Sequence, residues 1–181
     1  RPAIYVVNHA SLGDFFIATA IMPYGTVGVV KKQVVAYPFV GQVYMLSGHL
    51  RIDRGQHAEA VQSMKDLAAL VKRAGLSIYL SPEGTRSRDG RLKSFKKGWV
   101  HLAMQTGLPV VPIMVHDAHK AWRPDSLDLH GGRVRVEVLP AEDTSGWTPD
   151  NTDAAVEQIH AIYRAHLGPD QLPLPAAALA P

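Results

Sequence analysis

Short apolar runs alternate with segments of helical period along most of this chain, and that alternation restricts the fold more than any other feature. Residues 3–7 are rich in β-forming side chains, and apolar residues then recur at helical spacing from Phe16 onward. The same succession returns around residues 76–80 and 110–115, where short buried strands are expected. Because strands that alternate with helices form layered α/β structures, we expect a mixed central sheet flanked by helices.

The same patterns predict the remaining elements and the extent of the domain. Strands are expected near residues 26–30, 50–53 and 134–138, and helices from Pro38, over 57–74, over 98–106 and after Thr148. With 181 residues, of which 46% are hydrophobic, the chain is long enough for one core and one domain, expected over residues 1–167. The Pro- and Ala-rich residues 168–181 are expected to form a disordered tail.

Composition excludes several classes of protein. The chain has no cysteine, which removes both disulfides and a thiol nucleophile. Its formal net charge of +3 is low for a nucleic-acid-binding protein and suits contact with anionic lipid and phosphate. Residues 15–30 carry no charge, but Pro23 and Gly25 divide them into two elements that are each too short to cross a bilayer. No signal peptide is expected within this sequence.

His9 and Asp14 are the first candidate site residues, because they lie where the strand of residues 3–7 passes into a helical segment. A carboxylate in the first turn of that helix can accept a hydrogen bond from one imidazole nitrogen. The other nitrogen is then free to take a proton from a substrate hydroxyl. The same residues also fit a capping box, in which Ser11 caps the helix and Asp14 reaches back to the Ser11 amide. The spacing alone leaves both interpretations open.

A second candidate site follows the strand at residues 76–80. Gly84 allows the backbone to approach a ligand closely, and Thr85 and Ser87 offer hydroxyl groups. Arg86 offers a planar set of donors that matches a phosphate. The segment therefore indicates an anion site, with a polar turn and a solvated arginine as the alternative.

Four segments, taken in order, resemble the glycerolipid acyltransferase family, the group that contains the 1-acylglycerol-3-phosphate acyltransferases. They are the His-x4-Asp segment from His9 to Asp14, residues 52–54 preceded by Lys31, Lys32 and residues 38–41, residues 82–87, and residues 111–113. The resemblance covers roughly residues 3–140. The chain departs from the family pattern at Ser81, where phenylalanine is usual, and at residues 50–51, where an aromatic-rich approach is usual. Both departures flank the polar residues and bear on substrate preference more than on chemistry.

The resemblance implies transfer of an acyl group to a hydroxyl. His9, oriented by Asp14, would deprotonate the free hydroxyl of 1-acyl-glycerol-3-phosphate, which would attack an acyl thioester and give phosphatidic acid for phospholipid biosynthesis. No metal or other cofactor is implied, since acyl-CoA or acyl carrier protein serves as a co-substrate. The residues that would hold the acceptor, through its phosphate above all, are Glu83, Gly84, Thr85, Arg86, Arg54 and Lys32.

The resemblance also implies a lysophospholipid acceptor, no nucleic-acid partner, and a location at the cytoplasmic face of a membrane, peripheral or anchored, with any anchor outside this sequence. Two alternatives stay open. The acceptor is glycerol-3-phosphate or another lysolipid, or the chain is a catalytically inactive domain that binds lipid phosphate. Ser11 is a less favoured nucleophile because it is better placed as a helix cap.

Three further features each allow two interpretations. His116, Asp117 and His119 suggest metal ligands or, preferably, a solvated loop. The basic and aromatic residues 93–99 suggest an interfacial or phosphate contact, or a solvated loop. Trp122 and Trp147 suit either the core or a lipid interface.

Overall fold

The computed structural model describes residues 1–31, 42, 50–52, 57–123, 126 and 128–174. Its strands are β1 Ile4–Val7, β2 Thr26–Lys31, β3 Leu50–Ile52, β4 Ser77–Leu80, β5 Val110–His116 and β6 Arg135–Val138. Its helices are α1 Asp14–Ile21, α3 His57–Ala74, α4 Gly98–Thr106, α5 Ala118–Ala121, the 3-10 turn η2 Pro149–Asn151 and α6 Thr152–His166. The strands and helices that the patterns predict are therefore present, except the helix expected from Pro38, which falls outside the described residues.

The six strands form one sheet in the order β3-β2-β4-β1-β5-β6. β1 pairs in parallel with β4 on one side and β5 on the other, so that Ile4 lies opposite Ile78 and Val110. β6 pairs antiparallel with β5 and makes the sheet mixed, as expected. Because the first strand of the chain lies between two neighbours, its side chains are buried on both faces, which explains its apolar composition.

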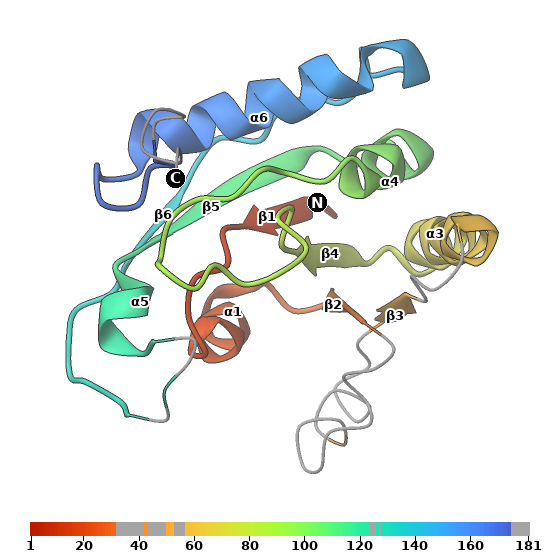
Figure 1. The fold of residues 1–181 in the computed structure, drawn as a ribbon. Helices are drawn as coiled ribbons and strands as arrows, with labels where there is room; N and C mark the ends of the chain where they lie inside the picture. The colour runs from red at the N-terminus through yellow and green to blue at the C-terminus, as the bar shows by residue number, and fades with distance from the viewer. Residues whose placement is uncertain (32–41, 43–49, 53–56, 124–125, 127, 175–181) are drawn as a thin grey trace.

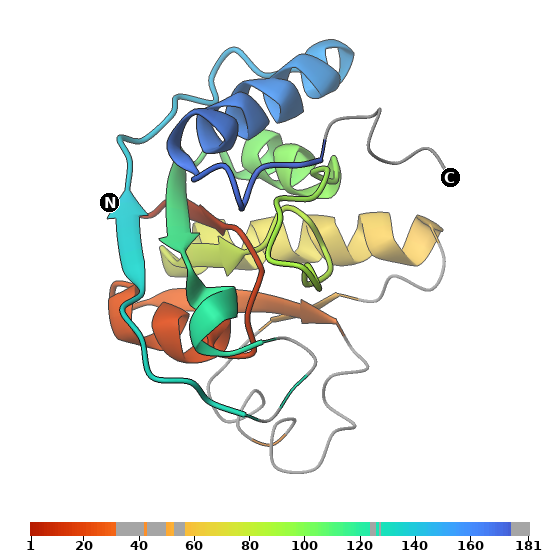
Figure 2. The ribbon, with the colours of Figure 1, turned by 60° about the vertical axis from the view of Figure 1, so that its left-hand side comes forward.

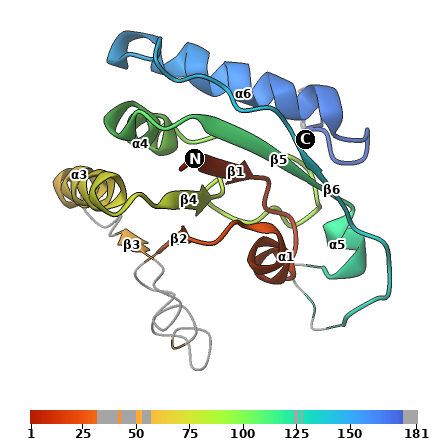
Figure 3. The ribbon, with the colours of Figure 1, turned by 180° about the vertical axis from the view of Figure 1, so that it is seen from behind.

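Helices cover both faces of the sheet (Figures 1 and 3). The side chains of the strands alternate between two cores, one on each face. Ile4 and Val6 of β1 point into the larger core, which α3, α4 and α6 cover. Tyr5 and Val7 point to the opposite face, which α1 and the short α5 cover. The strict alternation follows from the two-residue period of a strand and yields a three-layer α/β domain, as predicted.

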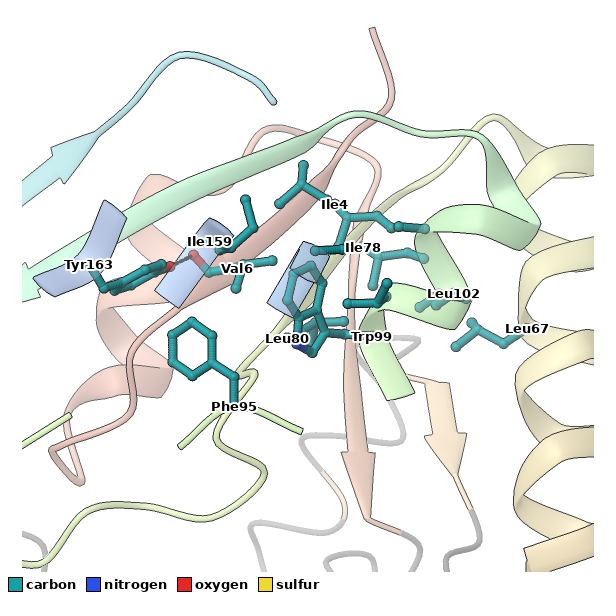
Figure 4. Close-up of a cluster of buried hydrophobic side chains, with 14 of the residues drawn as sticks. Ile4, Val6, Leu67, Ile78, Leu80, Phe95, Trp99, Leu102, Ile159 and Tyr163 are labelled. Atoms are coloured by element: carbon teal, nitrogen blue, oxygen red, sulfur yellow. Dashed lines mark hydrogen bonds between the residues drawn. The ribbon is translucent and has the colours of Figure 1, made fainter. Parts of the chain in front are cut away.

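Tyr163 of α6 connects this helix to the centre of the sheet (Figure 4). Pro112 lies opposite Val6 in the pairing of β1 with β5 and has no N–H to donate. The buried Tyr163 hydroxyl lies at this point: it accepts a hydrogen bond from the Ile113 N–H at 3.3 Å and donates one to the Val6 carbonyl. The contact fixes the end of β1 two residues before His9.

Residues 168–174 pack against the domain, so the prediction of a disordered tail beginning at residue 168 is wrong for them (Figure 2). Gln171 is buried, and its carbonyl accepts a hydrogen bond from the Leu92 N–H at 2.7 Å. Its side chain also contacts the Asp117 amide and the Val115 carbonyl. Composition suggested disorder, but one buried glutamine, whose side-chain amide and backbone carbonyl together bind three other residues, anchors the segment.

Candidate active site

The candidate residues gather where β1, β4 and β5 end. Neighbouring parallel strands bring their carboxyl ends to the same edge of a sheet, where α/β proteins usually bind ligands. The loop after β1 carries His9, the loop after β4 carries Glu83 and Arg86, and α5 follows β5 directly. Two of the four segments that carry the resemblance, residues 9–14 and 82–87, therefore meet in space.

Asn8 determines how the chain leaves the sheet. Its buried side chain donates from Nδ2 to the Val115 carbonyl at 3.0 Å, and its Oδ1 accepts from the Val115 N–H at 2.8 Å. The side-chain amide thus continues the pairing of β1 with β5 in place of a peptide group. This leaves the backbone free to turn, so that His9 lies outside the sheet.

Asp14 holds the His9 ring. The Nδ1 atom of His9 lies 2.6 Å from Oδ2 of Asp14, which is itself only 3% exposed. Oδ2 also accepts hydrogen bonds from the amides of Ala10 and Ser11, each at 2.9 Å. An ionised carboxylate can only accept, so Nδ1 carries the proton and Nε2 is left as a free base. The His9 side chain is 28% exposed, which makes it accessible to a ligand.

The capping interpretation of Asp14 is also partly confirmed. Asp14 reaches back to the Ser11 amide as in a capping box, but it is the first residue of α1, and the N-cap is Gly13, which has no side-chain cap hydrogen bond, and not Ser11. The Ser11 hydroxyl, however, accepts from Gly13 and donates to the Trp122 carbonyl at 2.7 Å. One oxygen of Asp14 therefore serves both the loop and the imidazole. Ser11 is buried with its hydroxyl engaged, so it is not placed to act as a nucleophile.

Glu83 contacts the main chain of His9. Its Oε1 accepts from the His9 N–H at 2.7 Å and its Oε2 from the Lys93 N–H at 3.0 Å. Burial and the negative charge of Asp14 raise the pKa of Glu83 to about 7, although the two N–H donors and Lys93 oppose this shift. Both oxygens are thus engaged with main chain, which differs from the expectation that Glu83 holds the acceptor's phosphate.

Arg86 and Thr85 fit the expected anion site. Within the described part of the chain, Arg86 has no ion pair, and its buried Nε has no hydrogen-bond partner. A half-buried guanidinium without a counter-ion favours an anionic ligand. The Thr85 hydroxyl accepts a hydrogen bond from Nζ of Lys93 at 2.9 Å, which brings a second cation to the loop. Gly84 has a φ of 73°, a left-handed conformation that favours glycine.

A cleft of about 370 Å³ lies beside this loop. Its walls are mostly apolar, and Gly84 and Lys96 contribute to them. The other residues that line it are Val29, Met64, Leu80, Ser81, Pro82, Gly98, Trp99 and Leu102. Such a size is usual for small-molecule sites, which run from about 300 to 1,000 Å³. The cleft therefore suits an apolar ligand held close to residues 83–86.

The other expectations have different outcomes. Arg54 and Lys32 lie outside the described residues. The metal-ligand interpretation of residues 116–119 gains no support, because the described residues contain no group of three or more potential ligands in a suitable arrangement. His116 instead contacts Glu137 at 3.1 Å and Arg135 at 3.2 Å. His119 packs on Gly90, where an added Cβ would lie 2.4 Å from its ring.

The two loop tryptophans and residues 93–99 differ in their surroundings. Trp147 packs edge to face on Trp99 of the core, with 5.7 Å between ring centroids. Trp122 instead stacks on the exposed Phe16 ring at 6.1 Å. Among residues 93–99, Lys97 forms an ion pair with Asp153, whereas Lys93 and Lys96 adjoin the candidate site.

Sequence reasoning gave no role to Asn8 or to the main chain of Ser87. Asn8 directly follows an apolar strand, and its side chain is an amide like the peptide group. That position is a usable signal for a residue that extends a sheet. The Ser87 N–H donates to the His9 carbonyl at 2.7 Å, a main-chain contact that leaves no mark in the residue types.

Comparison with known proteins identifies the family. Residues 1–116 match the family described as Acyltransferase. The chain is 47% identical over 174 residues to 1-acyl-sn-glycerol-3-phosphate acyltransferase of Limnanthes douglasii, covering 96% of this chain and 62% of that protein. It is 38% identical over 148 residues to the protein of the same name from Escherichia coli (strain K12), covering 82% of this chain and 60% of that protein.

A solved structure agrees with the fold. The crystal structure of the 1-acyl-sn-glycerophosphate (LPA) acyltransferase from Thermotoga maritima matches with a TM-score of 0.73 and 23% identity, covering 91% of this chain and 66% of that chain. The present chain spans less than two thirds of the length of the plant and Escherichia coli proteins. The match over more than half of the chain and the sequence identities show that the chain belongs to the glycerolipid acyltransferase family.

Proposed function

We propose that this chain transfers an acyl group from an acyl thioester to the free hydroxyl of 1-acyl-sn-glycerol-3-phosphate. The observation that carries the proposal is the His9–Asp14 pair, which leaves Nε2 of an accessible imidazole free as a base. Arg86, which has no counter-ion within the described residues, lies on the adjoining loop. The relatives that bear the name 1-acyl-sn-glycerol-3-phosphate acyltransferase support the same substrate class.

The reaction needs one base and no covalent intermediate on the protein. Nε2 of His9 takes the proton of the acceptor hydroxyl while the oxygen of that hydroxyl bonds to the thioester carbonyl carbon. The tetrahedral intermediate then collapses, the carbon–sulfur bond breaks, and the sulfur leaves as a thiol with the proton from the imidazolium. Asp14 keeps the ring in the correct tautomer and stabilises the imidazolium between these two steps.

The two substrates occupy different parts of the site. We assign the acceptor's phosphate to Arg86, with Thr85 and Lys93 on the same side. The apolar cleft beside Gly84 accommodates an acyl chain, because it adjoins the loop that carries Arg86 and offers few polar partners. The donor is acyl-CoA or acyl carrier protein, and the thiol-release assay distinguishes these two donors.

A membrane surface is part of the proposal. The solvent-facing residues of α1 are uncharged: Phe16 is 62% exposed and stacks on Trp122, and Thr19 and Ala20 accompany it. The backbone of Trp122 also forms an isolated antiparallel β-bridge with Leu129, another exposed apolar residue. A helix without charge on its outer face is unusual in water, and α1 begins at Asp14, beside the base. We define Phe16, Trp122 and Leu129 as the aromatic platform and propose that it contacts the lipid interface. Among the described residues, no helix has both the length and the apolarity that crossing a bilayer demands.

The activity is tested by following thiol release. Wild-type protein receives acyl-CoA or acyl carrier protein as donor, with lysophosphatidic acid, glycerol-3-phosphate or no acceptor. Release that depends on lysophosphatidic acid, is lost in His9→Ala and is retained in His101→Ala supports the proposal, because His101 is an exposed histidine on α4. Release with glycerol-3-phosphate alone would reassign the acceptor. No release from folded protein with lipid vesicles would favour a domain that only binds lipid phosphate.

The platform is tested by sedimentation with anionic lipid vesicles. Phe16→Glu is compared with Val138→Glu, which changes an apolar side chain of similar exposure on β6, at the edge of the sheet. An aromatic side chain that becomes buried in the lipid contributes about 1.5–3 kcal/mol to binding, so Phe16→Glu should weaken binding at least about tenfold. Equal binding of the two variants would remove the platform from the proposal.

A further inference from the structure

Glu83 is placed to hold main chain rather than substrate. It is only 2% exposed, and its two oxygens accept from the N–H groups of His9 and Lys93. A buried carboxylate with both oxygens occupied has no free oxygen for the acceptor, and its charge repels a phosphate. We propose that Glu83 is a positioning residue that fixes the backbone of His9 against the loop that carries Arg86. The inference rests on the proposed function, in which His9 is the base.

The loop that Glu83 belongs to holds His9 by a second contact. The His9 carbonyl accepts from the Ser87 N–H at 2.7 Å, so Glu83 binds the N–H of His9 and Ser87 binds its carbonyl, one on each of the two peptide units that flank His9. Ser87 is itself buried, and its hydroxyl donates to Asp89 at 2.8 Å. Arg86 lies between the two contacts in sequence. Its distance from the imidazole is therefore set by the same bonds that hold His9.

Two carboxylates divide the work of holding the turn. Three consecutive amides, those of His9, Ala10 and Ser11, each donate to a carboxylate. Glu83 takes the first, while Asp14 takes the other two and the imidazole Nδ1. Asp14 thus orients the ring relative to its own turn, and Glu83 fixes that turn relative to the rest of the site. Neither task can be performed by the other residue.

The charge of Glu83 is essential to this arrangement. A carboxylate presents two oxygens that both accept strongly, whereas glutamine turns an NH₂ group toward one of the two N–H groups and a protonated acid has a weaker acceptor at its hydroxyl oxygen. Burial above all, and then the negative charge of Asp14, raise the pKa of Glu83 to about 7, whereas the His9 and Lys93 amides and the Lys93 charge oppose this shift. The buried Tyr163 hydroxyl also senses the Glu83 charge. The contacts are therefore expected to weaken as pH falls below about 7.

The kinetic test uses Glu83→Gln, with Glu157→Gln as matched control on an exposed ion pair with Arg164. Misplacing a catalytic group by about 1 Å costs roughly 10²-fold in rate, so kcat should fall about 10- to 100-fold. The KM for lysophosphatidic acid should change less than about threefold, because no acceptor contact is lost. A rise in KM with kcat retained would show that Glu83 contacts the acceptor. Unchanged kcat and KM would show that it does not position His9.

A spectroscopic test separates this inference from the proposed activity. In ¹H–¹⁵N spectra of the wild-type chain, the His9 and Lys93 amide protons should both resonate downfield while Glu83 is charged, because both donate to its oxygens. The two signals should move together as pH crosses about 7. Glu83→Gln should abolish this common titration, and Glu157→Gln should preserve it. If Glu83→Gln does not fold, the wild-type titration decides alone. Independent movement of the two amides would overturn the inference, whereas absence of turnover with every acceptor would count against the proposed function only.

Discussion

Asp14→Asn is the most informative single change, because the structure fixes which way the new side chain must turn. Three donors converge on Oδ2 of Asp14, namely the His9 ring and the amides of Ala10 and Ser11. Oδ1 is buried and has no hydrogen-bond partner among the residues that the structure describes. The asparagine must therefore place its oxygen at the Oδ2 position and its NH₂ group in the space of Oδ1. The imidazole keeps its tautomer, and only the charge is lost.

The magnitudes follow from that geometry. An imidazolium and a carboxylate about 4 Å apart attract by about 4 kcal/mol at an effective dielectric constant near 20. The amide dipole recovers part of this, so about 2–3 kcal/mol of stabilisation is lost, or roughly 10²-fold in kcat. Three charge-assisted hydrogen bonds become neutral and one buried NH₂ gains no acceptor, while the cost of burying a charge disappears. We expect a net loss of about 2–3 kcal/mol in the free energy of unfolding.

Single-turnover thiol release and thermal unfolding measure both quantities on the same preparations. The expected result is a kcat about 10²-fold below wild type, with KM for the acceptor nearly unchanged and a Tm lower by roughly 4–12 °C. A loss as complete as that in His9→Ala would mean that the tautomer is not retained, and would refute the orientation argument. A lower Tm with wild-type kcat would leave Asp14 with a capping role alone.

Three other predictions address Arg86, Tyr163 and Glu83. Arg86→Ala should raise the KM for lysophosphatidic acid about 10- to 100-fold with a smaller effect on kcat, because a charged phosphate contact contributes about 1.5–3 kcal/mol; an unchanged KM in steady-state assays would exclude Arg86 as the phosphate ligand. Tyr163→Phe leaves the Val6 carbonyl and the Ile113 N–H without their shared partner, so calorimetry should show about 2 kcal/mol of destabilisation and a Tm lower by roughly 4–8 °C. The pKa of Glu83 is raised from 4.5 to about 7 on folding, because burial favours the protonated side chain even though the charged form makes the stronger amide contacts. The stabilisation that protonation provides is therefore complete below pH 4.5 and is lost as pH rises to about 7. The difference in unfolding free energy between wild type and Glu83→Gln should therefore fall by about 3 kcal/mol over this range, and a flat difference in denaturant titrations would show that the pKa is not raised.

The periodic part of the fold could be predicted from sequence because each element carries its own signal. The strand at residues 110–116 and the helix over 57–74 match their apolar patterns closely. The order of the strands, with the first strand between β4 and β5, depends on packing between distant segments and leaves no local pattern. Residues 168–174 misled for the same reason, since their composition predicts disorder and only the contacts of Gln171 show otherwise.

The candidate site was predictable in its residue types and less so in its roles. His9 and Asp14 could be paired because a histidine and a carboxylate at a strand-to-helix junction have few alternatives. Glu83 could not be separated from its neighbours Thr85 and Arg86, because all three are polar and adjacent in sequence. What distinguishes Glu83 is the direction of its side chain, which points at amides of two other segments. Main-chain partners of this kind are invisible in a sequence.

The hydrogen bond between the Val115 N–H and the Asn8 side chain makes the exchange of this one amide proton a measure of the mobility of the turn around His9. The Val115 N–H is bonded to Oδ1 of Asn8 and not to a peptide carbonyl, although it lies in a buried central strand. Its exchange with deuterium therefore requires only that the turn swing away from β5, whereas its neighbours exchange when the strands themselves separate. A single amide signal thus reads out how often the base leaves its place while the domain stays folded.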